Sequence, residues 1–148
     1  MKSGRKTFSD KNIIPYQSKF GKLHGSNYSE VRKNAEVIFK QIKSKTKRNP
    51  YIRSAYFNKQ KIFFDYFWPH LNQKRAKERY TRLKFFEAAI DIIKNSRNAP
   101  ISKQNPNRNS EILHRFFGLT KNKEIFYIQI KEDRKSGKKY FMSCFPPM

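Results

Sequence analysis

Residues 110–145 read SEILHRFFGLTKNKEIFYIQIKEDRKSGKKYFMSCF, and this stretch decides the fold. At its centre, the apolar residues Phe126, Ile128 and Ile130 alternate with more polar residues. Because successive side chains of a strand point to opposite faces, this alternation predicts a strand with one buried face and one wet face. Similar patterns on either side bring the expected strands to three, at Glu111–Phe117, Glu124–Lys131 and Lys138–Phe145.

Two long helices are expected before these strands. From Ser29 the apolar residues recur every three or four positions, with Ser29 placed as a cap and Asn49-Pro50 placed to end the helix. A second run with the same period covers Gln73–Asn95, where Ala88 and Ala89 also favour a helix. The first half of this second helix is strongly basic.

An aromatic-rich segment between the helices predicts a hairpin. Tyr51–Phe57 and Lys61–Trp68 alternate with a period of two, residues 58–60 join them, and Pro69 ends the second run. A helix is the alternative for this segment. Residues 95–109 contain two prolines and five asparagines, which favours a loop suited to form a mobile rim over a site.

Together these elements predict an α+β fold, with two main helices packed on an antiparallel sheet of three to five strands. Residues 1–27 are polar and basic, so we expect a partly ordered N-terminal arm there and a single domain over residues 28–148. A chain of 148 residues is long enough for one hydrophobic core and too short to expect two.

The charge of the chain points to a polyanionic partner. It has 34 Lys and Arg against 11 Asp and Glu, a formal net charge of +23, and the excess is spread along the sequence. Such a surface repels itself unless phosphates neutralise it, with release of counterions. Nucleic acid, RNA above all, is therefore the expected partner. A membrane surface is not, because that role needs a basic amphipathic helix with less polar flanks.

The single cysteine, Cys144, leaves no intramolecular disulfide and no cysteine-based zinc site. No apolar run approaches the length that spans a bilayer, and residues 1–20 lack the apolar core of a secretory signal. We therefore expect a soluble, cofactor-free protein that acts in the cytoplasm, either of its own cell or of a target cell into which it is delivered.

Cleavage of RNA without a metal is the chemistry that this composition allows. The RNA supplies its own 2′-hydroxyl as nucleophile, so the protein must supply a base, an acid and fixed cations. His114 is the first candidate for proton transfer, and His24, just before the first helix, is the second. Arg115 could hold the phosphate bidentately, and Ser143 on the last strand could donate a hydrogen bond.

His114 and Arg115 are adjacent, so they face opposite sides of a strand unless a bulge or a strand end intervenes. One of them is expected to join Tyr127, Gln129 and Lys131 on the wet face, while the other is structural. The second proton carrier must then come from the helical half, and His24 is the favoured residue. A strand histidine among apolar neighbours is more often a packing residue than a catalyst.

Other residues are expected to contact nucleic acid without doing chemistry. Tyr127, Tyr140 and Phe141 could stack on bases. The remaining candidates are the polar and basic residues Arg32, Lys74, Arg75, Arg79, Gln129 and Lys139. The alternative interpretation of the helical basic residues is a solvated surface, and His70, which follows Trp68-Pro69, could equally begin a helix with no chemical role.

A metal-dependent nuclease is the weaker alternative, because it needs clustered carboxylates and the chain has few. The nearest pattern is Asp65 with Gln129-Ile130-Lys131, which is faintly similar to a restriction-endonuclease-like core with Gln in place of its second acid. We expect no metal site. Glycine-rich phosphate loops, a Ser-His-Asp arrangement and His-x-x-x-His pairs are not visible in the sequence.

The order of elements over Leu23–Pro146 resembles the barnase, EndoU, colicin-tRNase and RelE-like (BECR) group of small ribonucleases. It is most similar to the barnase-EndoU-like domains of phages and mobile elements. The motifs that carry the resemblance are a His before the first helix and an Asn-Pro after it, with three segments in the sheet: His114-Arg115-Phe116, Phe126–Lys131 and Tyr140–Pro146.

This resemblance implies a metal-independent endoribonuclease of toxin or effector type, countered by a neutralising antitoxin or immunity protein. It implies His24 and His114 as acid and base, Arg115 or Lys131 on the phosphate, and Ser143 in support. The chain departs from the group in having no Glu plainly at the position of a barnase-like base. A non-catalytic RNA- or DNA-binding module is the alternative, followed by a structural protein of a nucleoprotein particle.

Overall fold

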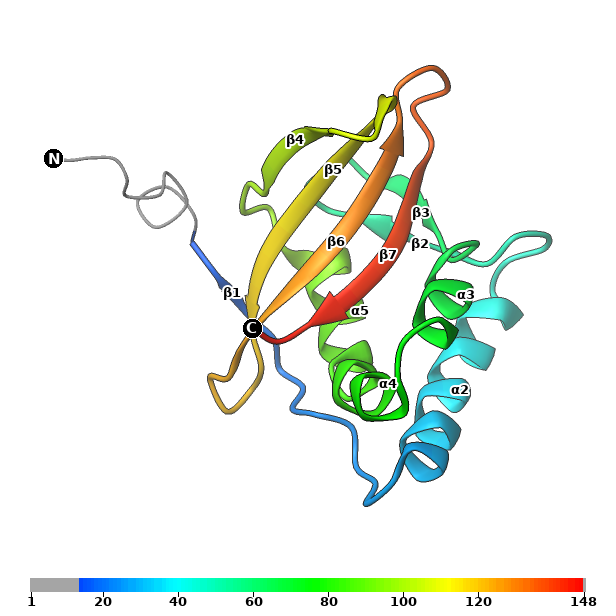
Figure 1. Ribbon diagram of the computed structural model, residues 1–148, viewed down its shortest axis with the longest axis vertical. Helices are drawn as coiled ribbons and strands as arrows, with labels where there is room; N and C mark the ends of the chain where they lie inside the picture. The colour runs from blue at the N-terminus through cyan, green and yellow to red at the C-terminus, as the bar shows by residue number, and fades with distance from the viewer. Residues whose placement is uncertain (1–13, 148) are drawn as a thin grey trace, which may run out of the picture.

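The computed structural model describes residues 14–147, in which four helices accompany a seven-stranded mixed sheet (Figure 1). The helices are α2 (Tyr28–Ser44), α3 (Phe67–Asn72), α4 (Ala76–Leu83) and α5 (Phe86–Asn95). The strands are β1 (Tyr16–Gln17), β2 (Tyr51–Ser54), β3 (Gln60–Phe63), β4 (Ile101–Asn105), β5 (Arg108–Leu119), β6 (Ile125–Asp133) and β7 (Lys139–Phe145).

The sheet runs in the order β1-β5-β6-β7-β3-β2, and β4 pairs with β5 beside β1. Its centre is an antiparallel meander of β5, β6 and β7, in which Arg115 lies opposite Gln129, and Gln129 opposite Ser143. Two further pairings are parallel, β1 with β5 and β3 with β7. The mixed sheet curls, so that β2 and β3 lie behind the meander in Figure 1.

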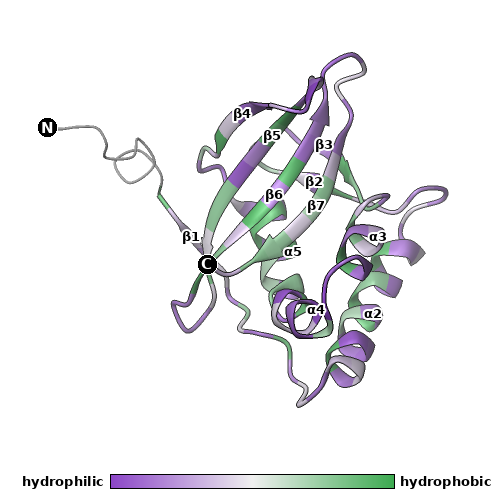
Figure 2. Ribbon diagram, viewed as in Figure 1, coloured by the Kyte–Doolittle hydropathy of each residue, from purple (hydrophilic) through white to green (hydrophobic). Residues whose placement is uncertain are grey.

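The core lies between the meander and α5, which contacts both β5 and β2 and so fills the inside of the curled sheet (Figure 1). Along β6, Phe126, Ile128 and Ile130 are fully buried, as their alternation predicts. The phenyl ring of Phe126 stacks on that of Phe85, with 4.7 Å between the centroids. Figure 2 shows the same alternation as bands of hydrophobic and hydrophilic residues along β5 and β6.

Helix α2 begins two residues earlier than expected, because Asn27 and not Ser29 is its cap. The Asn27 side chain accepts a hydrogen bond from the Glu30 backbone N–H at 3.0 Å, and the Glu30 carboxylate accepts from the Ser26 backbone N–H at 2.8 Å. These reciprocal bonds satisfy two donors that the first helical turn leaves free. The helical period is confirmed, but the predicted end at Asn49-Pro50 is wrong, because α2 ends at Ser44 and Lys45 is its C-cap.

The predicted architecture is wrong beyond the α+β class. The expected helix over Gln73–Asn95 is two helices, α4 and α5, interrupted at Lys84-Phe85. The end of the expected Lys61–Trp68 strand belongs instead to α3, where Pro69 stands in the first turn of the helix. A proline there costs no hydrogen bond, because the first N–H groups of a helix have no internal partner.

The sheet also has more strands than predicted, and some of them are parallel. Strand β4 lies in the expected loop over residues 95–109, and β1 lies in the expected arm, of which residues 1–13 fall outside the described range. The segment Ile101–Asn105 has no clear apolar alternation, because it forms an edge strand that is exposed at most of its positions. Backbone pairing with β5, rather than burial, holds it in place.

Within residues 14–147, no helix combines the length and the apolar character needed to cross a bilayer.

Candidate functional site

The side of the meander that faces away from α5 gathers a set of basic and aromatic side chains, which we call the outer-face cluster. Strands β5 to β7 supply most of it, and α4, α3 and the residue before α3 supply the rest. Its members are Tyr66, His70, Arg82, Arg115, Tyr127, Gln129, Lys131, Tyr140, Ser143 and Phe145.

Two arginines share one phenyl ring at the centre of this cluster. The guanidinium carbon of Arg82 lies 5.0 Å from the centroid of the Phe145 ring, and that of Arg115 lies 5.2 Å from the same centroid. Arg115 also stacks on Tyr127 at 5.4 Å. Arg82 has one acidic neighbour, Glu78, at 3.7 Å. Arg115 pairs with no carboxylate in the described range, so the pair retains an excess of positive charge.

A bulge in β7 brings Ser143 and Phe145 into the cluster. The register shifts between Gln129 and Ile130, so that Gln129 lies opposite Ser143 while Ile130 lies opposite Phe141. Met142 is the extra residue, and it reverses the alternation beyond it. Ser143 therefore faces outward, where its hydroxyl accepts a hydrogen bond from Arg82 Nη1 at 2.9 Å.

Lys131 lies in the aromatic half of the cluster. Its ammonium group is 3.9 Å from the centroid of the Tyr66 ring and 3.3 Å from a carboxylate oxygen of Glu111. The rings of Tyr66 and Tyr140 meet edge to face, with their centroids 4.8 Å apart. Burial is the main factor that raises the pKa of Tyr140.

His70 is a titratable group that this part of the molecule brings near Arg82. It follows Tyr66 by one turn, since the His70 backbone N–H donates to the Tyr66 carbonyl at 3.0 Å. Burial, followed by the charges of Lys74 and Arg82, lowers the pKa of His70 below its ordinary value of 6.5. The imidazole is therefore neutral near pH 7, which is the form that can accept a proton.

This arrangement can bind a phosphate and place a base near it. Guanidinium groups bind phosphate oxygens through charge-assisted hydrogen bonds, and the partly exposed rings beside them offer surfaces on which bases stack. A neutral imidazole next to fixed cations can take a proton from a hydroxyl while the cations stabilise the charge that develops on phosphate.

Six of the residues singled out from the sequence lie together in the outer-face cluster. The wet face of β6 is as predicted, and Arg115, not His114, is the residue that joins it, because Arg115 lies opposite Gln129. The six are Arg115, Tyr127, Gln129, Lys131, Tyr140 and Ser143.

His114 lies on the other face of the sheet, where it is 7% exposed. Its Nδ1 and the Ser102 hydroxyl are hydrogen-bonded at 2.6 Å, and its Nε2 lies 2.8 Å from Glu132 Oε1. Lys139 is also buried on this face, with its ammonium group donating to the Gln60 side chain and lying 3.9 Å from Glu132. A Ser-His-Glu chain of hydrogen bonds thus exists where the sequence indicated no such arrangement.

Within residues 14–147, His24 forms no hydrogen bond with Arg82 or Arg115. It is exposed in the segment before α2, where its carbonyl accepts from Asn34 and its charge acts on Glu87 of α5. The structure therefore does not bring His24, His114 and Arg115 together as the sequence analysis expected.

The basic helical candidates are only partly available to a ligand. Arg32 donates to Glu36 at 2.7 Å and stacks on Trp68 at 4.6 Å. Arg79 donates to the Lys74 carbonyl at 2.6 Å. Arg75 is exposed just before α4. The charge of Lys74 contributes to lowering the pKa of His70, which belongs to the outer-face cluster.

Sequence reasoning missed Arg82, Tyr66 and Phe145, and it assigned no chemistry to His70. Nothing in the local sequence separates Arg82 from the other basic residues of its helix, because its partner Ser143 is 61 residues away. The contact between Glu132 and His114 could have been predicted from the register of a β5–β6 hairpin. That register sets Ile112 opposite Glu132 and His114 opposite Ile130, so His114 and Glu132 are diagonal neighbours on one face of the sheet.

Within residues 14–147, no group of three or more His, Cys, Asp or Glu side chains is placed to hold a metal ion. Asp65, the acid of the metal-dependent alternative, is exposed, and its closest polar contact is the Asn49 side chain at 3.5 Å.

Comparison of the chain with protein-family models, with curated proteins and with solved structures found no match.

Proposed function

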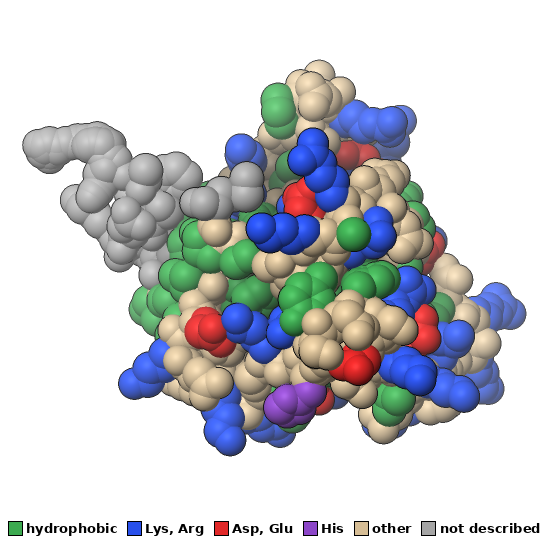
Figure 3. All heavy atoms as spheres, turned by 60° about the horizontal axis from the view of Figure 1, so that its bottom comes forward, with side chains coloured by type: hydrophobic (Ala, Val, Ile, Leu, Met, Phe, Trp, Pro, Cys, Tyr) green, Lys and Arg blue, Asp and Glu red, His purple; other side chains and the backbone are tan. Residues whose placement is uncertain are grey.

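We propose that this protein is a metal-independent endoribonuclease that binds and cleaves RNA at the outer-face cluster. The observation that carries the proposal is the pair of guanidinium groups of Arg82 and Arg115, which lie 5.0 and 5.2 Å from the Phe145 ring centroid, with His70 close enough for the charge of Arg82 to lower its pKa. Figure 3 shows basic side chains spread over the visible face, with acidic side chains among them, and the net charge of +23 would attract the phosphates of an RNA strand.

The proposed reaction assigns one role to each group. His70 accepts the proton of the 2′-hydroxyl as its oxygen forms a bond to phosphorus, and Lys131 donates a proton to the 5′-oxygen as the P–O5′ bond breaks. Arg82 and Arg115 hold the phosphate and stabilise its added charge. The products are a 2′,3′-cyclic phosphate and a free 5′-hydroxyl.

This assignment keeps the ribonuclease hypothesis and moves the base to a different histidine. Tyr66 connects the proposed base and acid, because its carbonyl accepts from the His70 backbone N–H and its ring lies 3.9 Å from the Lys131 ammonium group. His114 is held by Ser102 and Glu132 on the opposite face, and we assign it a structural role.

The test is cleavage of labelled RNA in excess EDTA by the parent protein and by His70→Gln, Arg115→Ala and Lys135→Ala. We expect the His70 and Arg115 substitutions each to lower the rate by about 10²-fold or more. Lys135 is exposed in the β6–β7 turn, outside the cluster, so its substitution should leave the rate unchanged. Cleavage by the parent that vanishes with EDTA would contradict the proposal.

A non-catalytic RNA-binding module is the second candidate. The rings of Tyr127 and Phe145, each flanked by a guanidinium group, favour it because such surfaces bind unpaired bases without chemistry. Tight RNA binding by the parent with no cleavage product would select this function over the ribonuclease.

A ribonuclease in the cytoplasm would harm the cell that makes it, so the proposal includes a neutralising partner. An acidic protein covering Arg82 and Arg115 would have the required charge. Toxicity on expression that is relieved by Arg115→Ala would support this part of the proposal, and harmless expression of an active parent would count against it.

A further inference from the structure

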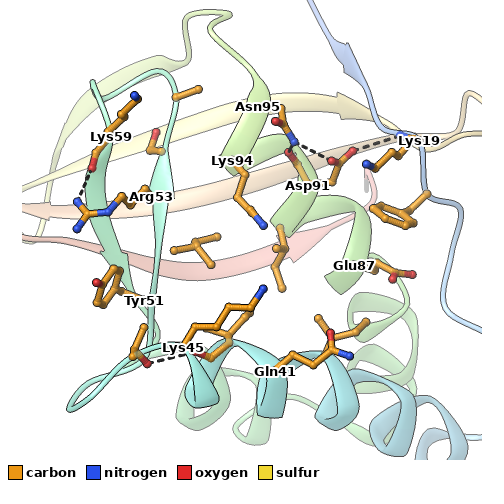
Figure 4. A pocket seen from close by; sticks show the side chains of 18 of the residues that line it. Lys19, Gln41, Lys45, Tyr51, Arg53, Lys59, Glu87, Asp91, Lys94 and Asn95 are labelled. Atoms are coloured by element: carbon orange, nitrogen blue, oxygen red, sulfur yellow. Dashed lines mark hydrogen bonds between the residues drawn. The ribbon is translucent and has the colours of Figure 1, made fainter.

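A second basic surface lies away from the outer-face cluster, in a cavity of about 900 Å³ that we call the α2–α5 groove (Figure 4). Its walls come from α2, α5, β2 and the segment around Lys19. Helix α5 packs on the inner face of the sheet, so the sheet separates this groove from the arginine pair. None of the residues of the outer-face cluster lines it.

Most of the charged side chains that line the groove are cations. Six basic side chains line it, all of them exposed, and none forms an ion pair within the described part of the chain. By contrast, Lys22, Arg32, Lys131 and Lys139 are all near carboxylates. The six are Lys19, Lys45, Arg53, Lys59, Lys94 and Arg97.

Two acidic residues, Asp91 and Glu87, line one end of the groove. The Asp91 carboxylate accepts hydrogen bonds from the Ser18 hydroxyl at 2.8 Å, the Lys19 backbone N–H at 3.2 Å and the Asn95 side chain at 2.9 Å. Burial, followed by the charge of Asp91, raises the pKa of Glu87. The cations at the other end, such as Lys45 and Arg53, form no ion pair within the described part of the chain and keep their positive charge.

The basic end has the geometry of a channel for a chain of phosphates. In Figure 4 the side chains of Lys45 and Lys94 reach into the cavity from opposite walls, while Arg53 and Lys59 stand on the wall formed by β2 and the turn after it. Tyr51 lines the same end, and the guanidinium carbon of Arg53 lies 5.4 Å from its ring centroid. Cations on several walls, with an aromatic ring between them, suit successive phosphates and an unpaired base.

We propose that the α2–α5 groove binds a second segment of single-stranded nucleic acid through its phosphates. The protein would then hold two segments at once, one at the outer-face cluster and one in the groove. The groove site goes beyond the proposed cleavage and does not depend on it, because it concerns binding at residues that the reaction does not use. The count of two short oligonucleotides per molecule rests in addition on the proposed binding of RNA at the outer-face cluster.

The test counts the bound strands with a 2′-O-methyl oligonucleotide of about eight nucleotides, which lacks the nucleophile for cleavage. Native mass spectrometry and calorimetry should give two sites for the full chain. Lys45→Glu with Lys94→Glu should weaken the groove site by about tenfold or more and leave one strand bound. Lys135→Glu with Lys138→Glu makes the same change of charge in the exposed β6–β7 turn and should leave two.

Three results separate the explanations, provided that thermal melting shows each variant to be folded. A parent that binds one strand, unaffected by the Lys45 and Lys94 changes, overturns the groove. Arg115→Ala should remove the other site and leave the groove site, so loss of both sites with Arg115→Ala also overturns it. ATP bound in the groove as tightly as the oligonucleotide would identify a mononucleotide site and overturn the assignment to a strand.

Discussion

His114 and Arg115 are neighbours in the chain, yet they have opposite environments. The His114 ring is buried beside Phe57, with 5.0 Å between the ring centroids, and both of its nitrogens are hydrogen-bonded. Arg115 is exposed and stacks on Tyr127 and Phe145. One residue therefore stabilises the fold while its neighbour is free to meet a ligand, so the two substitutions should have separable effects.

We expect His114→Ala to lower the free energy of unfolding by about 2–4 kcal/mol, because it removes buried hydrogen bonds and leaves Glu132 and Lys139 without their neighbour. Arg115→Ala should change it by less than about 0.5 kcal/mol, since the side chain is exposed. Urea denaturation measures both values, and RNA affinity measured on the folded variants should fall only for Arg115→Ala. Equal stability losses would contradict this division.

His70 should make the folded protein sensitive to acid. Its folded pKa lies below 6.5, so as the pH falls through about 6.5 the unfolded chain binds a proton that the folded protein does not yet bind. Stability present above that pH is therefore lost on acidification. His70→Gln should lose less stability between about pH 7 and pH 5 than the parent in chemical denaturation. A parent and variant with parallel pH dependence would show that His70 does not titrate in this way.

At the scale of elements, the approach of α5 to β5 sets the thickness of the core. A Cβ atom at Gly118 would lie 2.5 Å from Ile92 Cδ1 and 3.2 Å from the ring of Phe126, both of them buried. Glycine is therefore required here by packing, because a larger residue would push α5 off the sheet or force buried side chains out of their rotamers.

Gly118→Ala is expected to destabilise the fold by about 1–3 kcal/mol through overpacking. Gly21→Ala is the matched control, because its Cβ would meet only Asn122 Nδ2, at an ordinary distance of 3.6 Å. Thermal and urea unfolding of the two variants should differ accordingly. A Gly118→Ala protein as stable as the control would mean that α5 can shift without loss.

At the scale of the whole molecule, the net charge of +23 opposes the compact state. Salt screens this repulsion, so the melting temperature should rise between about 50 mM and 500 mM NaCl. RNA binding should respond in the opposite direction, since affinity from phosphate contacts falls as salt increases. A melting temperature that falls with salt would indicate that attractive ion pairs outweigh the repulsion.

Several features follow from the sequence because they depend on near neighbours in the chain. The period-two pattern of Phe126, Ile128 and Ile130 was sufficient to assign the faces of β6. The adjacency of His114 and Arg115 in a strand was sufficient to predict that only one of them lies on the wet face. The composition determined the charge of the surface. The edge strand β4 escaped prediction because its residues are mostly exposed and show no clear alternation.

The sequence by itself determined the α+β class, the meander and its wet face, because these rest on the local alternation of side chains. Only the tertiary structure decided the strand order, the parallel pairings and the bulge that turns Ser143 outward. It also decided that Arg82 would meet Ser143, and that six cations would line one groove. The physical reason is that these arrangements arise from contacts between segments far apart in the chain, whose pairing is selected by packing of the whole core.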